Sequence, residues 1–156
     1  MGFQPDGSWR PNPKQERFVA LPDTIKEAFY GGAAGGGKSD VLLLLPILRR
    51  WQEAERFKGV FLRRTYPELR DEIIPRAKHY FKSLNANYVK QSMTFEFPSG
   101  AMFIFSHCEH EDDVHKFDST EINYLALDEL TSFTEYQYTY IGFTRVRSSD
   151  RNLPSI

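Results

Sequence analysis

One run of eight residues carries the strongest chemical signal in the chain. The spacing G-x-x-x-x-G-K-[ST] is met at every fixed position by Gly32, Ala33, Ala34, Gly35, Gly36, Gly37, Lys38 and Ser39. Glycines permit positive φ angles that turn backbone N–H groups inward, and a following helix adds its positive end, so such a loop holds phosphate. We expect Lys38 to reach the β and γ phosphates of ATP, and the Ser39 hydroxyl to bind Mg²⁺. A purely structural glycine turn is the alternative, and four glycines followed by Lys-Ser argue against it.

Two carboxylates form the second signal. Residues 122–127 are nearly all apolar, as expected of a strand buried on both faces, and Asp128 and Glu129 follow directly. We expect Asp128 to hold Mg²⁺ through its water shell. Glu129 is expected to orient and deprotonate the attacking water, which a hydrolase needs and a phosphate-transferring kinase does not. An Asp-Glu pair can also open a solvated helix, and the upstream glycine loop favours the catalytic interpretation.

Hydrolysis also requires positive charge, for which the chain offers two arginine pairs. Arg145 and Arg147 follow the predicted Glu129 helix, and their position leaves open an arginine finger or a structural role at a carboxylate or sheet edge. Arg63 and Arg64 lie where a predicted strand ends, the place where α/β proteins bind ligands. They are candidates for sensing nucleotide or contacting a DNA phosphate. Surface ion pairs are the alternative, with Glu68, Asp71 or Glu72 as partners.

The elements that must position these residues alternate between strands and helices. We predict strands at 25–30, 59–62 and 122–127, and a hairpin of 93–97 with 101–106. Helices are predicted at 14–21, 38–57 with a kink at Pro46, 68–84 with an interruption at Pro75, and 134–144. This order predicts an α/β P-loop NTPase of the ASCE type, with a largely parallel central sheet flanked by helices. Residues 1–13 are expected to form an irregular leader and 14–156 the ATPase domain.

Two further groups of side chains receive a structural interpretation. A possible metal site made of His107, Cys108, His110 and His115 fits no standard zinc spacing, so we predict a polar loop there. Aromatic side chains at helical spacing in 133–143 are expected to be core residues, with base stacking as the alternative.

The composition limits the cellular compartments and binding partners that the chain fits. The chain has 156 residues, is 40% hydrophobic and carries a formal net charge of −1, so attraction to nucleic acid requires a local patch. A single cysteine forms no internal disulfide, which fits a reducing compartment. The longest apolar run, 41–48, contains Pro46 and is far shorter than the roughly 20 residues of a membrane span. No signal peptide is recognisable, and we expect a cytosolic protein without a membrane contact.

Four segments together resemble the ATPase domain of the large terminase subunit, the DNA-packaging motor of tailed bacteriophages. They are residues 13–18 (PKQERF), 30–39 (YGGAAGGGKS), 62–69 (LRRTYPEL), and 127–134 (LDELTSFT) with the Arg145-Val146-Arg147 segment downstream. The resemblance implies that Gln15 reads the adenine and that Arg145 or Arg147 stabilises charge, in some motors on a neighbouring subunit's ATP.

The function implied by this resemblance is Mg²⁺-dependent ATP hydrolysis that drives double-stranded DNA into a procapsid. The implied partners are the DNA, the portal protein, the small terminase subunit and further copies of the chain in a ring. The implied location is the host cytoplasm, at the procapsid portal.

The chain also departs from the family pattern. Some terminases carry an arginine inside the glycine loop, whereas this loop offers Ala33 and Ala34. The family's coupling motif and its RNase H-like nuclease domain are not recognisable before Ile156, so we expect an N-terminal ATPase fragment that hydrolyses ATP poorly and does not cut DNA. Three alternatives remain: another P-loop DNA motor or helicase-like ATPase, a small-molecule kinase, and a nucleotide-binding module without turnover.

Overall fold

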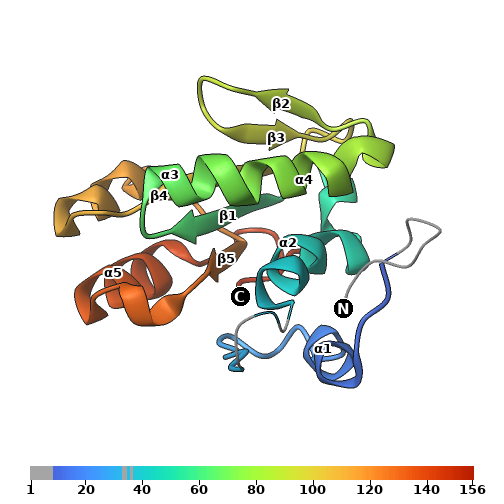
Figure 1. Cartoon of the computed structure of the whole chain (residues 1–156), viewed down its shortest axis with the longest axis horizontal. Helices are drawn as coiled ribbons and strands as arrows, with labels where there is room; N and C mark the ends of the chain where they lie inside the picture. The colour runs from blue at the N-terminus through green and yellow to red at the C-terminus, as the bar shows by residue number, and fades with distance from the viewer. Residues whose placement is uncertain (1–8, 33–34, 36) are drawn as a thin grey trace.

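A five-stranded sheet forms the centre of the structure, a computed structural model that describes residues 9–32, 35 and 37–156. Its strands are β1 (Lys58–Arg63), β2 (Asn87–Val89), β3 (Thr94–Glu96), β4 (Met102–His107) and β5 (Tyr124–Leu127), in the order β2-β3-β4-β1-β5 (Figure 1). Strand β1 runs parallel to β4 and β5, whereas β2, β3 and β4 pair antiparallel. The predicted α/β class and the hairpin are confirmed. The sheet is mixed and not largely parallel, because β3 runs opposite to its neighbours β2 and β4, which makes two of the four strand pairings antiparallel.

The helical elements connect and cover these strands. They are α1 (Pro13–Val19), α2 (Lys38–Leu48), α3 (Tyr66–Glu68), α4 (Ile74–Phe81) and α5 (Glu135–Arg145). A π-helical turn, Leu69–Ile73, joins α3 to α4, and short 3-10 helices lie at Trp51–Glu53, Lys82–Leu84, Glu111–Phe117 and Leu130–Ser132. Within the described ranges, no helix has the length and apolar character that crossing a bilayer requires.

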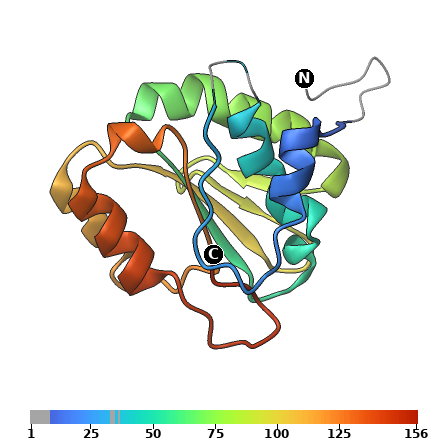
Figure 2. The same cartoon turned by 90° about the horizontal axis from the view of Figure 1, so that it is seen from below.

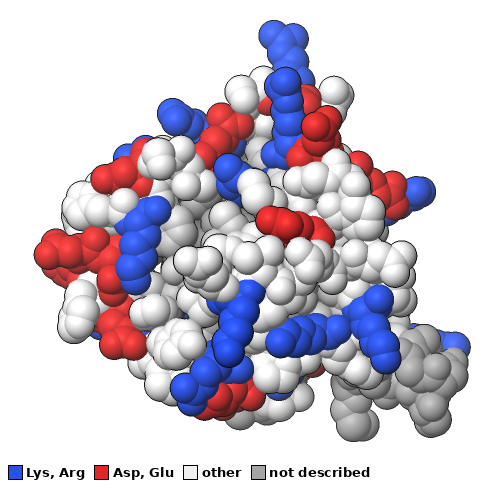
Figure 3. Space-filling model, turned by 90° about the horizontal axis from the view of Figure 1, so that it is seen from above, with Lys and Arg blue, Asp and Glu red and all other residues white. Residues whose placement is uncertain are grey.

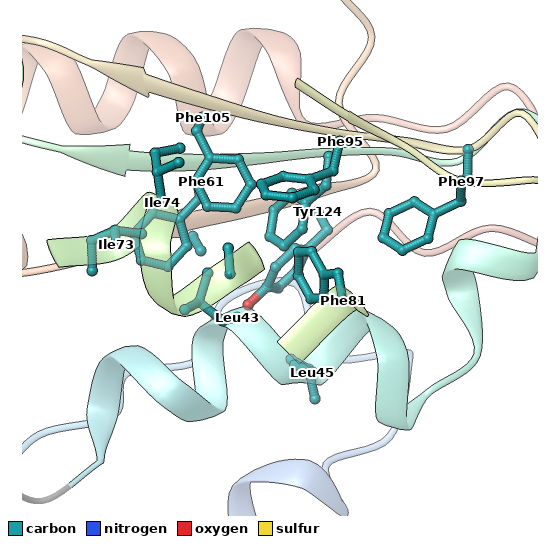
Figure 4. Close-up of a cluster of buried hydrophobic side chains, with 14 of the residues drawn as sticks. Leu43, Leu45, Phe61, Ile73, Ile74, Phe81, Phe95, Phe97, Phe105 and Tyr124 are labelled. Atoms are coloured by element: carbon teal, nitrogen blue, oxygen red, sulfur yellow. The ribbon is translucent and has the colours of Figure 1, made fainter. Parts of the chain in front are cut away.

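Side chains alternate along β1 and divide the interior into two cores. Phe61 belongs to the larger cluster, together with Leu43 of α2 and Phe81 of α4. Figure 4 shows strand residues of this cluster facing those two helices. Val60 and Leu62 point to the opposite face and join a second cluster with Ile141 of α5. The sheet therefore lies between α2 and α4 on one face and α5 on the other.

Helix α2 continues through Pro46, where a side chain replaces the hydrogen bond that proline removes, and the predicted kink stays a prediction. Pro46 lies inside α2, where a proline lacks the N–H that would bond to the carbonyl of Leu42. The buried Tyr124 hydroxyl of β5 donates to that carbonyl at 2.9 Å. Helix α2 continues to Leu48, and Arg50 then adopts a left-handed conformation with φ of 58°. The helix predicted to reach residue 57 therefore ends nine residues earlier.

The predicted strand at 25–30 is also wrong, since this segment does not join the sheet. Strand β5 is the edge strand, and its outer side is engaged by Ile156. Leu125 N–H donates to the Ile156 carbonyl at 2.8 Å, and Ile156 N–H donates to the Asn123 carbonyl at 3.0 Å. Figure 2 shows the chain between α1 and α2 passing the C-terminus as an extended trace. The apolar side chains of the segment 25–30 line a cavity beside β5, and the backbone of this segment does not pair with a strand.

Candidate active site

The glycine loop leads into the N-terminus of α2. Gly37 precedes the helix with a φ of 66° and, as a glycine, offers no side chain to cap the first N–H groups of α2. Those groups and the positive end of the helix dipole favour an anion at this point. Gly35 also has a positive φ, 78°. Ala33, Ala34 and Gly36 lie outside the described residues, so their predicted phosphate contacts stay predictions.

The first helical residues connect the loop to the sheet. The ammonium of Lys38 donates to the carbonyl of Gly32 at 2.9 Å, so this side chain folds back over the loop. The Ser39 hydroxyl donates to Oδ2 of Asp128 at 2.7 Å. Residues 89 positions apart in the sequence, each predicted to serve the metal, are thereby in direct contact.

Strand β5 delivers the two acidic residues to the same place. Asp128 is 2% exposed, and its backbone N–H donates to the carbonyl of Leu62 on β1 at 3.0 Å. Glu129 follows in a left-handed conformation with φ of 57°, and its side chain is 53% exposed. A non-glycine residue rarely adopts this conformation outside tight turns and functional sites. The carboxylate of Asp128 is therefore fixed inside the protein, whereas that of Glu129 reaches solvent.

The structure gives both carboxylates a common partner, Arg63 at the end of β1. Its Nε lies 3.1 Å from Oδ2 of Asp128, and its Nη1 lies 3.2 Å from Oε1 of Glu129. Strands β1 and β5 are parallel, so their carboxyl ends meet at one edge of the sheet. The sequence placed Arg63 at this edge but left nucleotide sensing and surface ion pairs open. Its burial, with 6% of the residue exposed, had no signal in the sequence.

A cavity of about 680 Å³ opens beside these residues. Lys38, Asp128 and Glu129 are among its lining residues, with apolar residues of α1, α2, β5 and the segment 25–32. Charged side chains also line it, namely Asp23, Lys26, Glu27 and Arg49. Small-molecule sites commonly have this size and combine an apolar lining with a few polar groups. The oxygen atoms of Ser39 and Asp128 suit Mg²⁺, which prefers oxygen ligands and retains several waters. The described residues thus fit a magnesium-bound nucleotide, with the phosphates at the start of α2.

Gln15 lies beneath the loop. It is fully buried, its Nε2 donates to the Gly37 carbonyl at 3.0 Å, and its Oε1 accepts from the Asn12 N–H at 2.9 Å. Both ends of the amide are therefore engaged in fixing α1 against the loop. Adenine recognition by Gln15 stays a prediction that requires at least one of these bonds to open.

The predicted arginine pair lies elsewhere. Arg145 ends α5, where its Nη2 lies 3.3 Å from Oδ1 of Asp118 and its guanidinium lies over the Tyr140 ring. Arg147 is exposed, and its backbone N–H donates to the carbonyl of Ile122. The contacts of the described residues therefore place neither guanidinium with Lys38 or Asp128, and the predicted catalytic role of Arg145 and Arg147 stays a prediction.

The segment after β4 is more ordered than the predicted polar loop. Cys108 is buried, and burial raises the pKa of its thiol to about 11. Residues 111–117 form a 3-10 helix, and the carboxylate of Asp113, its third residue, accepts from the His110 N–H at 2.8 Å. Burial raises the pKa of Asp113, but this bond and Lys116 outweigh it and lower the pKa to about 2. In the part of the chain that the structure describes, no three metal-binding side chains gather here or elsewhere.

Searches of the chain against protein-family models, curated proteins and solved structures found no match.

Proposed function

We propose that the protein binds Mg²⁺-ATP at the start of α2 and hydrolyses it. One observation carries the proposal: the Ser39 hydroxyl lies 2.7 Å from the Asp128 carboxylate. The sequence assigns these residues, separately, to the phosphate loop and to the acidic end of a buried strand, and a common metal explains their proximity. The glycine spacing supplies the nucleotide class.

Each residue then has a physical task. The amides at the start of α2 and the Lys38 ammonium bind the phosphates. Ser39 and Asp128 would hold Mg²⁺, which supplies charge neutralisation to the phosphates when bound. Glu129, the exposed carboxylate, accepts a proton from the water that attacks the terminal phosphorus. The bond to the leaving ADP oxygen breaks, and inorganic phosphate is released.

We further propose that this hydrolysis drives the translocation of double-stranded DNA into a procapsid. This proposal is supported by the four sequence segments that resemble the large terminase subunit, with the portal protein and small terminase subunit as partners. Arg147 is exposed, as an arginine acting on a neighbouring subunit in a ring requires. On the face shown in Figure 3, Lys and Arg side chains lie among Asp and Glu side chains, so charge alone does not mark a DNA-binding surface there.

Nucleotide binding is tested by titrating Mg²⁺ and a fluorescent ATP analogue into wild type, Lys38→Ala and Lys82→Ala. Lys82 is an exposed lysine on a short 3-10 helix and serves as the matched control. Because charge-assisted hydrogen bonds contribute about 1.5 to 3 kcal/mol, Lys38→Ala is expected to weaken binding at least about tenfold. Equal affinities of the three proteins would remove the phosphate-binding role of Lys38.

Hydrolysis is tested by phosphate release from Glu129→Gln and from Glu135→Gln, an exposed glutamate at the start of α5. Loss of a general base is expected to slow release about 10²-fold or more at unchanged nucleotide affinity. A Glu129→Gln rate equal to that of wild type would exclude Glu129 as the base.

The packaging role is tested separately by comparing ATPase stimulation by procapsids that carry their portal with stimulation by free DNA. A response to DNA without any response to the portal would favour another DNA motor.

A further inference from the structure

Arg63 has more acidic neighbours than a single arginine can bind closely. Besides Asp128 and Glu129, its Nη1 lies 3.7 Å from Oε2 of Glu68 and its Nη2 lies 3.6 Å from Oε2 of Glu72. The side chain of Arg63 is only 7% exposed, so its charge depends on these carboxylates for compensation. One guanidinium therefore serves four carboxylates, two in the candidate site and two on the helical segment that follows β1.

The four contacts fall into a near pair and a far pair. Asp128 and Glu129 lie 3.1 and 3.2 Å from the guanidinium, whereas Glu68 and Glu72 lie beyond ordinary hydrogen-bond distance. Nη1 faces Glu129 and Glu68 at once, and it is closer to Glu129 by 0.5 Å (3.2 Å against 3.7 Å). Nη1 thus forms a close ion pair with Glu129 and faces a second carboxylate, that of Glu68, at a longer distance.

A second, independent observation concerns the hydrogen bonding of the Glu68 carboxylate. Its Oε2 is buried and has no hydrogen-bond partner among the described residues, and this is the oxygen that faces Nη1. A buried carboxylate oxygen without a donor is costly, and a small movement of the guanidinium would supply one. Glu68 directly precedes the π-helical turn, a rare geometry that is frequent at functional sites.

We propose that Arg63 is a positioning residue that exchanges between Glu129 and Glu68. In the structure the guanidinium holds the Glu129 carboxylate; when it moves to Glu68, the Glu129 carboxylate is released toward water. The exchange itself follows from the contacts of Arg63, and its role in turnover rests on the proposed hydrolysis. The exchange also connects the Glu129 carboxylate to the helical segment that follows β1. The side chains of Glu68 and Glu72 on this segment are 40% and 57% exposed, and a charged partner can reach them.

The exchange is tested without nucleotide by a double-mutant cycle in urea unfolding. Glu129→Gln is combined with Glu68→Gln and with Glu68→Asp. Aspartate keeps the charge of Glu68 but is one methylene too short to reach Nη1. Either change at Glu68 is expected to lower the folding equilibrium constant about fivefold more in the Glu129→Gln background than in wild type, because Nη1 of Arg63 has then lost both of its carboxylate partners.

The Glu68→Asp variant separates contact from charge repulsion. If Glu68 and Glu129 only repel each other, Glu68→Asp behaves as wild type in both backgrounds, and the proposal is overturned. Independent effects in the cycle overturn it as well. Asp71→Asn is the matched control, since Asp71 lies on the same segment and pairs with Arg70. It is expected to have the same effect in both backgrounds.

Turnover provides the second measurement. With Mg²⁺-ATP, Glu68→Asp is expected to lower kcat about threefold at unchanged KM, because Arg63 then stays on Glu129. A normal kcat overturns the link between the exchange and catalysis. A wild-type protein that binds no nucleotide or releases no phosphate instead refutes the proposed function, and the unfolding cycle still decides whether Arg63 exchanges.

Discussion

The bond from Tyr124 to α2 predicts a specific coupling between two substitutions. Tyr124→Phe removes the hydroxyl that donates to the Leu42 carbonyl, the group left without a helical partner by Pro46. A buried acceptor that loses its donor costs about 1 to 3 kcal/mol, and the aromatic ring itself is retained. We expect Tyr124→Phe to lower the free energy of unfolding by about 2 kcal/mol, which corresponds to a Tm lower by roughly 4 to 8 °C at this chain length.

Pro46→Ala provides the matched background, because alanine restores an N–H for the Leu42 carbonyl. In this background the cost of Tyr124→Phe is expected to fall to about 0.5 kcal/mol or less. Urea unfolding of the four proteins, followed by tryptophan fluorescence, measures the difference. An equal cost of Tyr124→Phe in the wild-type and Pro46→Ala backgrounds would show that the hydroxyl does not compensate for the proline.

The same bond has a functional readout. Tyr124 begins β5, the strand that ends before Asp128, and Leu42 lies one turn after Lys38 on the loop's helix. Loosening this connection in Tyr124→Phe is expected to weaken Mg²⁺-ATP binding, and Pro46→Ala is expected to restore part of the affinity. Nucleotide titration of the same four proteins checks this expectation.

Three further predictions follow from described contacts. Gly37→Ala combines a left-handed φ with a Cβ only 2.5 Å from Nε2 of Gln15, so it is expected to cost about 1 to 2 kcal/mol more in urea unfolding than Gly35→Ala, whose Cβ meets nothing within 4 Å. Equal costs would show that Gln15 does not support the loop. The lowered pKa of Asp113 gives stability that is complete above about pH 4 and lost as the pH falls through about 2. Asp113→Asn should therefore flatten that part of an acid titration by about 2 kcal/mol, and an unchanged slope would contradict the carboxylate's role. The raised pKa of Cys108 predicts alkylation at pH 8 that is about 100-fold slower in native protein than in urea, and comparable rates would show that the thiol is accessible.

Much of the candidate site was predictable because it depends on local rules. The apolar run before Asp128 predicted a strand, and the glycine spacing predicted the helix that begins at Lys38. Parallel strands bring their carboxyl ends together, so the proximity of Arg63 to Asp128 also follows from topology. The motifs assigned Ser39 and Asp128 to one predicted metal site, and their side chains are in contact, while the metal itself stays a prediction.

The remainder depends on contacts between distant residues, which a local pattern does not contain. The run 25–30 has strand composition, but strand formation needs a neighbouring edge, and Ile156 engages the outer side of β5. A proline breaks most helices, whereas here the distant Tyr124 hydroxyl donates to the Leu42 carbonyl, the group that Pro46 leaves without a helical partner. Helical spacing predicted Tyr136 and Phe143 as core, yet they are 42% and 66% exposed. The fully buried residues of α5 are instead Gln137 and Ile141, and the Gln137 amide Nε2 donates to the Cys108 carbonyl.

The separation of the segment 25–30 from the sheet has a dynamic consequence. The glycine loop and α2 are joined to β5 and Asp128 through side chains, from Ser39 to Asp128 and from Tyr124 to the Leu42 carbonyl. The backbone ladder of the sheet does not include the chain that leads into the loop. Local opening can therefore detach the loop while β1, β4 and β5 stay folded. Amide hydrogens of 26–30 should exchange with deuterium well before those of β1, and a bound nucleotide that bridges the loop and Asp128 should slow them selectively.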